Sequence, residues 1–179
     1  AHGKLVEPLI RYTQFTQALP IEQYNNKFWN IAYDFWEGTG QVPLGSPSVF
    51  NFFLPDYQPI GPISQQGLIA PEYQIHNTKT SVEYINQVNN WTAYNYVMAN
   101  WEDEPWVILN TDELTPLARD PEVLLNRLDV LFTHGQLTDR TRSIIKSALE
   151  QLQRGDYRDD RVRLALYLLL ISPDYAIFK

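Results

Sequence analysis

Apolar residues recur every three to four positions along most of this chain, which is the spacing of amphipathic helices. The first such segment runs from Leu5 to Leu19 and is ended by Pro20. The second runs from Ile21 to about Trp36, and Gly38 follows it as a typical residue for the end of a helix. Both segments are predicted to be helices with one apolar face.

A third long helix is predicted from a capping signal at its start. Thr80 and Glu83 have the spacing of a capping box, in which each side chain accepts a hydrogen bond from the other residue's backbone N–H. We expect this helix to reach about Asn100, with a core stripe of Tyr84, Val88, Trp91, Asn95 and Met98. The opposite face carries almost no charge and several amides, Asn86, Asn89, Asn90 and Asn100. It is either an amide-rich surface or a face that a partner covers.

The last third of the chain has the clearest helical pattern. Asp120 caps a helix that ends near Gly135, with inward-facing side chains at Leu124, Leu125, Leu128, Leu131 and Phe132. Thr138 caps the next helix, whose inward-facing side chains are Ile144, Ile145, Ala148, Leu149 and Leu152. The third begins at Asp159 or Asp160, and its uninterrupted apolar run over 164–171 is expected to be buried. Short connections predict that these helices are antiparallel neighbours.

No strand-like alternation, internal repeat or low-complexity tract competes with these helices. The sequence therefore predicts an all-α fold, a single domain over 1–179 built as a helical bundle of roughly six helices. The longest apolar run is far shorter than the ~18–20 residues that a membrane-spanning helix requires. We expect no membrane span.

One long segment rich in proline and glycine departs from the helical pattern. Ser46, which is followed by proline, predicts the start of a short helix over 46–54 that Pro55 ends. The aperiodic stretch 55–70 carries its own apolar residues, so we expect an ordered loop packed across the helical bundle. Glu72, directly after a proline, lies in the first turn of the next predicted helix.

The composition narrows the possible functions. The net charge is −7 and no basic cluster is present, which disfavours nucleic-acid binding. Without cysteine there is no disulfide framework, thiol catalysis or cysteine-ligated metal. The three histidines are far apart, and the acidic run over 102–104 lacks the spacing of a calcium loop, so no metal or cofactor is predicted. The many aromatic side chains either fill gaps between helices or form a binding surface.

Three groups of residues resemble one known family. The first is SPSVFNFFLPDYQPIGP followed by GLIAPEYQI, within residues 46–75. The second is Gly3-Lys4, Glu7-Pro8 and Arg11, and the third is Ala165-Leu166-Tyr167 with Ser172-Pro173-Asp174-Tyr175. Together they resemble the bacterial domain of unknown function 1800 family over almost the whole chain.

The resemblance implies a location and partners. Family members commonly carry export signals, so an extracytoplasmic location is expected, whether periplasmic, secreted or at the cell surface. They are often encoded beside a second exported protein, which makes that protein a candidate partner. Members are also longer, with an N-terminal helical half before the Gly3-Lys4 motif. This chain therefore resembles a C-terminal fragment or a truncated chain, and the N-terminal half is the other candidate partner.

Four polar residues at the two ends of the aperiodic loop are candidate site residues: Ser46, Asp56, Tyr57 and Glu72. Asp56 and Glu72 would act as acid and base if their surroundings separate their pKa values. The alternative is structural, in which Ser46 caps a helix, Asp56 closes an Asx turn and Glu72 complements a helix N-terminus.

Our leading hypothesis is a non-catalytic helical domain of an exported bacterial protein, with a role in interaction or assembly. A second hypothesis is a carbohydrate-binding module, because sugars stack on aromatic rings. Trp101 and Trp106 would be its platform and a polysaccharide its ligand. A third is a hydrolase whose site is completed by the N-terminal half, and it requires Asp56 and Glu72 in one cleft.

Overall fold

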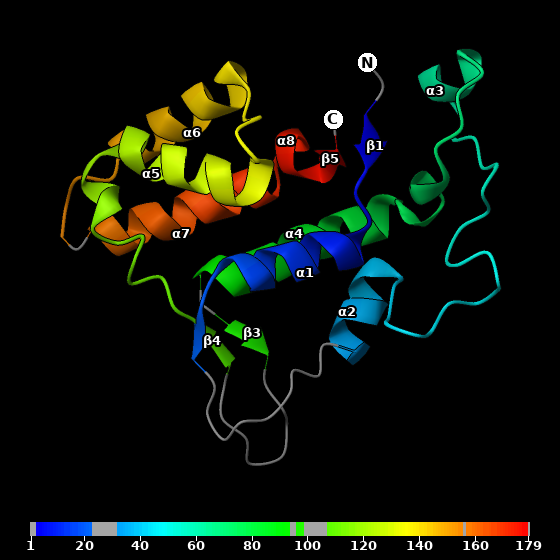
Figure 1. Cartoon of the computed structure of the whole chain (residues 1–179), viewed down its shortest axis with the longest axis horizontal. Coiled ribbons are helices and arrows are strands. Elements are labelled where there is room, and N and C mark those ends of the chain that lie inside the picture. Colours follow the sequence, from blue (N-terminus) through cyan, green and yellow to red (C-terminus); the bar gives the residue numbers. More distant parts are fainter. Residues whose placement is uncertain (1–2, 23–31, 94–95, 99–106, 156, 179) are drawn as a thin grey trace.

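The computed structural model describes residues 3–22, 32–93, 96–98, 107–155 and 157–178, and most of these lie in helices (Figure 1). The longer helices are α1 (Pro8–Ala18), α2 (Ala32–Thr39), α4 (Thr78–Ala93), α5 (Pro121–Leu128), α6 (Asp139–Glu150) and α7 (Tyr157–Leu170). Shorter helical turns are α3 (Pro62–Gln65), η1 (Pro71–Ile75), η2 (Leu117–Arg119), η3 (Asp129–Thr133) and α8 (Pro173–Ala176). The mainly helical character of the fold is thereby confirmed.

Within the described residues, five very short strands correct the prediction that the fold has helices alone. β1 (Lys4–Leu5) pairs antiparallel with β5 (Ile177–Phe178), which brings segments from the two ends of the sequence together. β4 (Val107–Leu109) lies between β2 (Ile21–Glu22) and β3 (Tyr96–Met98), also antiparallel. Strands of two or three residues are too short to show alternation, so their sequence gives no strand signal. β3 also ends the predicted third helix well before Asn100.

The core is built where aromatic side chains of α1, α2 and α4 meet. Trp91 of α4 stacks on Phe15 of α1 at 5.2 Å between ring centroids, and Tyr12 lies 4.9 Å from the same indole. Phe35 of α2 packs on Tyr12 at 5.1 Å. The predicted core residues Tyr84, Val88 and Trp91 are buried. Here the aromatic residues act mainly as fillers between helices, as one of the two interpretations expected.

The residue that caps α4 is Asn77, three residues before the predicted cap at Thr80. The residues that cap each other are Asn77 and Thr80: the Thr80 N–H donates to Asn77 Oδ1 at 3.1 Å, and the Asn77 N–H donates to Thr80 Oγ1 at 2.9 Å. Asparagine is as strong an N-cap as a hydroxyl residue, so the earlier of two competing signals starts the helix.

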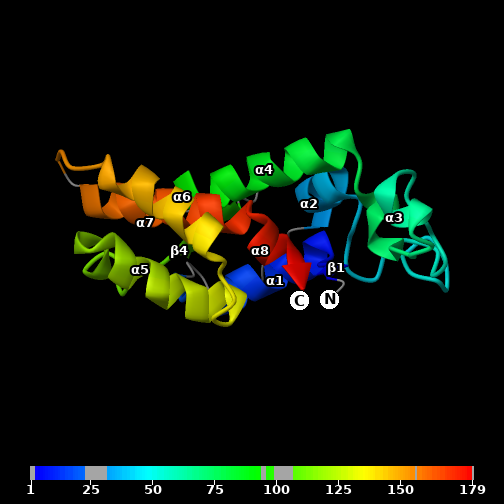
Figure 2. The same cartoon turned by 90° about the horizontal axis from the view of Figure 1, so that it is seen from above.

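Helices α5, α6 and α7 follow the sequence closely. Asp120 caps α5 by accepting from the Glu122 N–H at 2.8 Å, and Thr138 caps α6 by accepting from the Thr141 N–H at 3.3 Å. The predicted inward position of Ile144 is wrong, because the face of α6 that meets α5 and α7 is centred on Ile145 and Leu149. Figure 2 shows these three helices at the opposite end of the molecule from α3.

The largest error concerns residues 44–69, which we call the signature loop. The helix predicted over 46–54 is absent, and the chain instead forms turns with positive φ at Leu44 (61°) and Asn51 (70°). Several large apolar residues of the loop do not pack on the long helices: Val49 is 95% exposed and Ile60 is 103% exposed. In Figures 1 and 2 the loop extends away from the long helices at the α3 end.

Candidate functional site

The candidate site residues of the signature loop are spread out. Ser46 and Asp56 are exposed, and Tyr57 is half-buried. The Tyr57 carbonyl accepts from the Ala70 N–H at 2.9 Å and so closes the second half of the loop on itself. Trp101 and Trp106 lie outside the residues that the structure describes.

Glu72 is the candidate that the fold uses most clearly. Its side chain is 4% exposed, and its Oε1 lies 2.8 Å from Nζ of Lys4, whose own side chain is 67% exposed. The hydrogen bond to Glu72 is the main reason that the pKa of Lys4 is raised above its usual value. The ion pair joins the Gly3-Lys4 motif to the Pro71-Glu72 motif, which are 68 residues apart, and the sequence contained no signal that they would pair.

A groove of about 580 Å³ lies between β1 and the segment that runs from α3 to η1. One wall is formed by Gly3, Lys4 and Leu5, and the Lys4–Glu72 ion pair lies in this groove. The other wall is mostly apolar, with Pro62, Ile63, Leu68, Ile69, Ala70 and Pro71. This volume is within the range of pockets that bind small molecules or short peptide segments.

The position of β1 beside the groove depends on Gly3. A Cβ atom at this position would lie 2.3 Å from Cγ2 of Ile177, which is closer than such atoms approach in proteins. Glycine therefore lets β1 contact β5 closely, and a substitution here would push the groove wall away from the body of the protein.

Other residues of the N-terminal motif hold α1 in place. The Gln41 side chain is buried and connects two groups of this motif: its Nε2 donates to Glu7 Oε2 at 2.8 Å, and its Oε1 accepts from the Leu9 N–H at 3.1 Å. The guanidinium of Arg11 lies 4.0 Å from the ring centroid of Tyr84. The Tyr175 hydroxyl donates to the Arg11 carbonyl. These contacts give the motif a structural role in anchoring α1.

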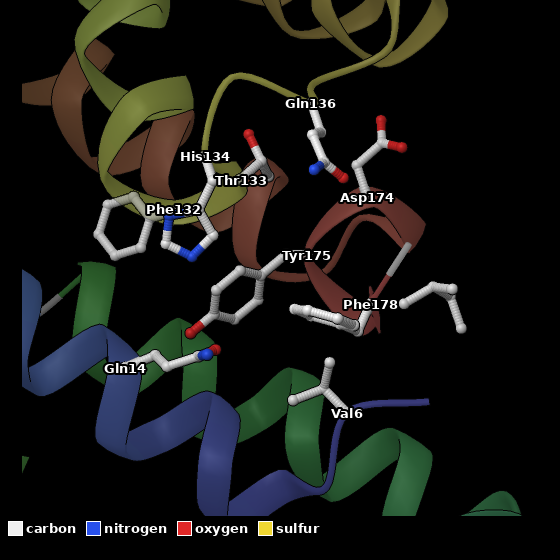
Figure 3. A pocket seen from close by; sticks show the side chains of 10 residues that line it. Val6, Gln14, Phe132, Thr133, His134, Gln136, Asp174, Tyr175 and Phe178 are labelled. Carbon is white, nitrogen blue, oxygen red and sulfur yellow. The ribbon is translucent and has the colours of Figure 1, made fainter. Parts of the chain in front are cut away.

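A second, much smaller cavity lies between α1, η3 and α8 (Figure 3). Its volume is about 40 Å³, enough for water but not for a substrate. Figure 3 shows Tyr175 between His134 and Gln14, and Asp174 on the α8 side. Asp174 Oδ2 already accepts hydrogen bonds from the Thr138 N–H and hydroxyl, so it serves the start of α6.

The amide-rich face of α4 borders a third hollow, of about 450 Å³, between α4 and α7. Asn89 lies on the α4 side and Arg163 and Tyr167 on the α7 side. Asn86 and Asn89 are exposed, as both interpretations of this face require, and Asn100 lies outside the described residues.

The geometry does not assemble a hydrolytic pair. Asp56 is not among the residues that line the groove containing Glu72, and the carboxylate of Glu72 is already paired with Lys4. Among the described residues, no group of three or more histidine, aspartate or glutamate side chains is placed to hold a metal ion. The groove is therefore better suited to binding than to acid–base chemistry.

Comparison with known proteins gives one match. The model of the family described as "Protein of unknown function (DUF1800)" matches residues 1–177. No match was found among curated proteins or among solved structures. Of the helices in the described part of the chain, none is long and apolar enough to cross a membrane.

Proposed function

The chain belongs to the DUF1800 family of proteins of unknown function, and from this premise we propose that it is an interaction domain of an exported bacterial protein. In this proposal the domain does no chemistry of its own. It binds another polypeptide through the signature loop and contributes to the assembly of a larger extracytoplasmic protein.

The observation that carries the proposal is the apolar surface of the signature loop. Six large apolar side chains of the loop are exposed: Leu44, Val49, Phe50, Leu54, Ile60 and Ile69. Single exposed apolar residues are ordinary on protein surfaces, but this many within one short segment are typical of an interaction site.

The loop also has an ordered backbone, as a docking surface requires. The Leu54 N–H donates to Gln74 Oε1 at 2.7 Å, and the Ala70 N–H donates to the Tyr57 carbonyl at 2.9 Å. These bonds tie the middle of the loop to the segment before α4. Preorganised segments lose less conformational entropy on binding, which supports a role in recognition.

The partner that we propose is the N-terminal helical half that the family resemblance implies, with a co-encoded exported protein as the alternative. A helical half can supply the apolar face that would cover the loop. The hydrolase and carbohydrate hypotheses have less support, because Asp56 does not line the groove with Glu72 and because Trp101 and Trp106 lie outside the described residues.

The test is affinity capture of partners from the exported fraction of a bacterium that carries the gene. Wild-type chain is compared with Val49→Asp and Ile60→Asp, and Val130→Asp serves as a matched control. Val130 is also an exposed apolar residue, at 61%, but it lies in η3, away from the loop.

We expect capture of a family N-terminal half or an exported protein that weakens about tenfold or more in the two loop variants, because apolar anchors dominate interfaces. The control should bind like wild type. Equal capture by all four proteins, or the absence of any such partner, would overturn the proposal.

A further inference from the structure

The outer edge of β1 has backbone groups that make no hydrogen bond to any described residue. Within the β1–β5 ladder, Lys4 pairs with Phe178, and the Val6 N–H donates to the Ala176 carbonyl at 2.8 Å. Antiparallel strands alternate the direction of these groups, so Leu5, between Lys4 and Val6, points its N–H and C=O away from β5. Neither group has a hydrogen-bond partner within the described residues.

Gly3 lies directly before β1 and two residues from Leu5, which is the spacing at which an extended backbone repeats the direction of its N–H and C=O groups. Its backbone groups also have no hydrogen-bond partner in the described part of the chain. Both residues line the groove between β1 and the α3–η1 segment. One side of the groove is therefore an open strand edge.

The groove also limits what can bind there. Its two charged side chains, Lys4 and Glu72, already neutralise each other, so a charged ligand has no unpaired counter-charge in the groove. The facing wall is mostly apolar. Backbone donors and acceptors that repeat every second residue, opposite an apolar wall, match an extended polypeptide, which has the same repeat.

We propose that this groove binds an extended peptide segment that adds a strand to the free edge of β1. Main-chain hydrogen bonds to Leu5 and Gly3 hold the segment, and its apolar side chains pack against Leu68 and Ile69. The inference rests on the proposed function and specifies it, since the partner then contributes a strand.

Continuity with the signature loop supports a peptide of the same partner. Pro62, Ile63, Leu68 and Ile69 belong both to the loop and to the groove wall. A polypeptide that covers the exposed apolar residues of the loop therefore extends directly into the groove.

The first test uses a displayed library of random linear heptapeptides, selected on the whole 179-residue chain. The selected peptides are then measured against Ile69→Asp and against Ile144→Asp. These isoleucines are matched, at 59% and 58% exposed, but only Ile69 lines the groove. We expect binders whose affinity falls about tenfold or more with Ile69→Asp and stays within about twofold with Ile144→Asp.

The second test asks whether the peptide binds through its backbone. Each peptide amide is methylated in turn, which removes one N–H donor and blocks strand pairing at that position. We expect a loss of about tenfold or more at alternate positions, with smaller effects between them, because only every second amide faces β1. Exchange of the Leu5 amide hydrogen with solvent should also slow when the peptide binds.

Three results would overturn the inference: no selected peptide depends on Ile69, methylation at every position has the same effect, or Leu5 exchange does not change. These failures differ from failure of the proposed function. If the loop variants lose the native partner but no selected peptide depends on Ile69, the interaction role stands without strand addition. If peptides bind in the groove but no native partner is captured, the groove binds an extended peptide and the proposed interaction role fails.

Discussion

At the scale of single residues, several buried polar groups have a defined structural task. Tyr84 in α4 is an example, because its hydroxyl donates to the Leu170 carbonyl at 3.1 Å and so joins α4 to the end of α7. Burial, the largest effect, raises the pKa of Tyr84 to about 12. The phenol therefore stays neutral in the folded protein over a range in which it ionises in the unfolded chain.

This difference predicts an alkaline loss of stability. A folded-state pKa above the unfolded value of about 10 means that the contribution is complete below pH 10 and is lost as pH rises towards 12. Between pH 10 and pH 11 the wild-type protein should lose about 1 kcal/mol more of its unfolding free energy than Tyr84→Phe.

Urea unfolding at the two pH values measures this difference. A Tyr84→Phe profile as steep as that of the wild type would contradict the prediction.

At the scale of elements, one buried carboxylate connects α5, η3 and α6. Asp129 Oδ2 lies 2.8 Å from Nη2 of Arg142, and its Oδ1 accepts from the Leu137 N–H at 3.0 Å. The Thr133 hydroxyl donates to the same carboxylate. Asp129 thus fixes the turn between α5 and α6 through Leu137, and its ion pair with Arg142 joins these two helices.

Removing this carboxylate should weaken the packing between α5 and α6. We expect Asp129→Ala to lower the free energy of unfolding by about 2–4 kcal/mol, because it leaves the buried Leu137 N–H without its acceptor and breaks the ion pair with Arg142 Nη2. Lys146→Ala, which removes a more exposed ion pair with Glu122, should change stability much less. Chemical denaturation measures the unfolding free energy of both variants. Equal losses of unfolding free energy would contradict the larger role of Asp129.

Elements also show how much the sequence can predict. Caps and periodic stripes predicted α5 and α6, because local hydrogen bonds and burial act in the same direction there, and an uninterrupted apolar run predicted the buried part of α7. The helix expected over 46–54 failed for a physical reason: periodicity reports which residues share a face, not whether that face meets the core. Glu72 was singled out from its position, but its partner Lys4 was not, since their pairing depends on tertiary structure alone.

At the scale of the whole molecule, the apolar loop and the apolar core are separate. The signature loop lies at one end, while the core residues lie among the long helices (Figure 2). Changes on the loop should therefore affect binding without affecting folding.

The prediction is that Val49→Asp and Ile60→Asp each keep the unfolding free energy within about 0.5 kcal/mol of the wild type, because exposed sites away from packing are tolerant. Thermal or urea unfolding of each purified variant measures this. A loss of several kcal/mol would mean that the loop packs on the core in solution, contrary to its exposure.

The pairing of β1 with β5 has a consequence for synthesis. A ribosome makes Lys4 and Leu5 well before their pairing partners Ile177 and Phe178, which follow more than 170 residues later. The strand that forms one wall of the groove is therefore fixed in place only when translation has passed residue 178. Nascent chains that stall earlier lack this wall, so a partner that binds the strand edge would bind chains that include β5 and would not bind shorter ones.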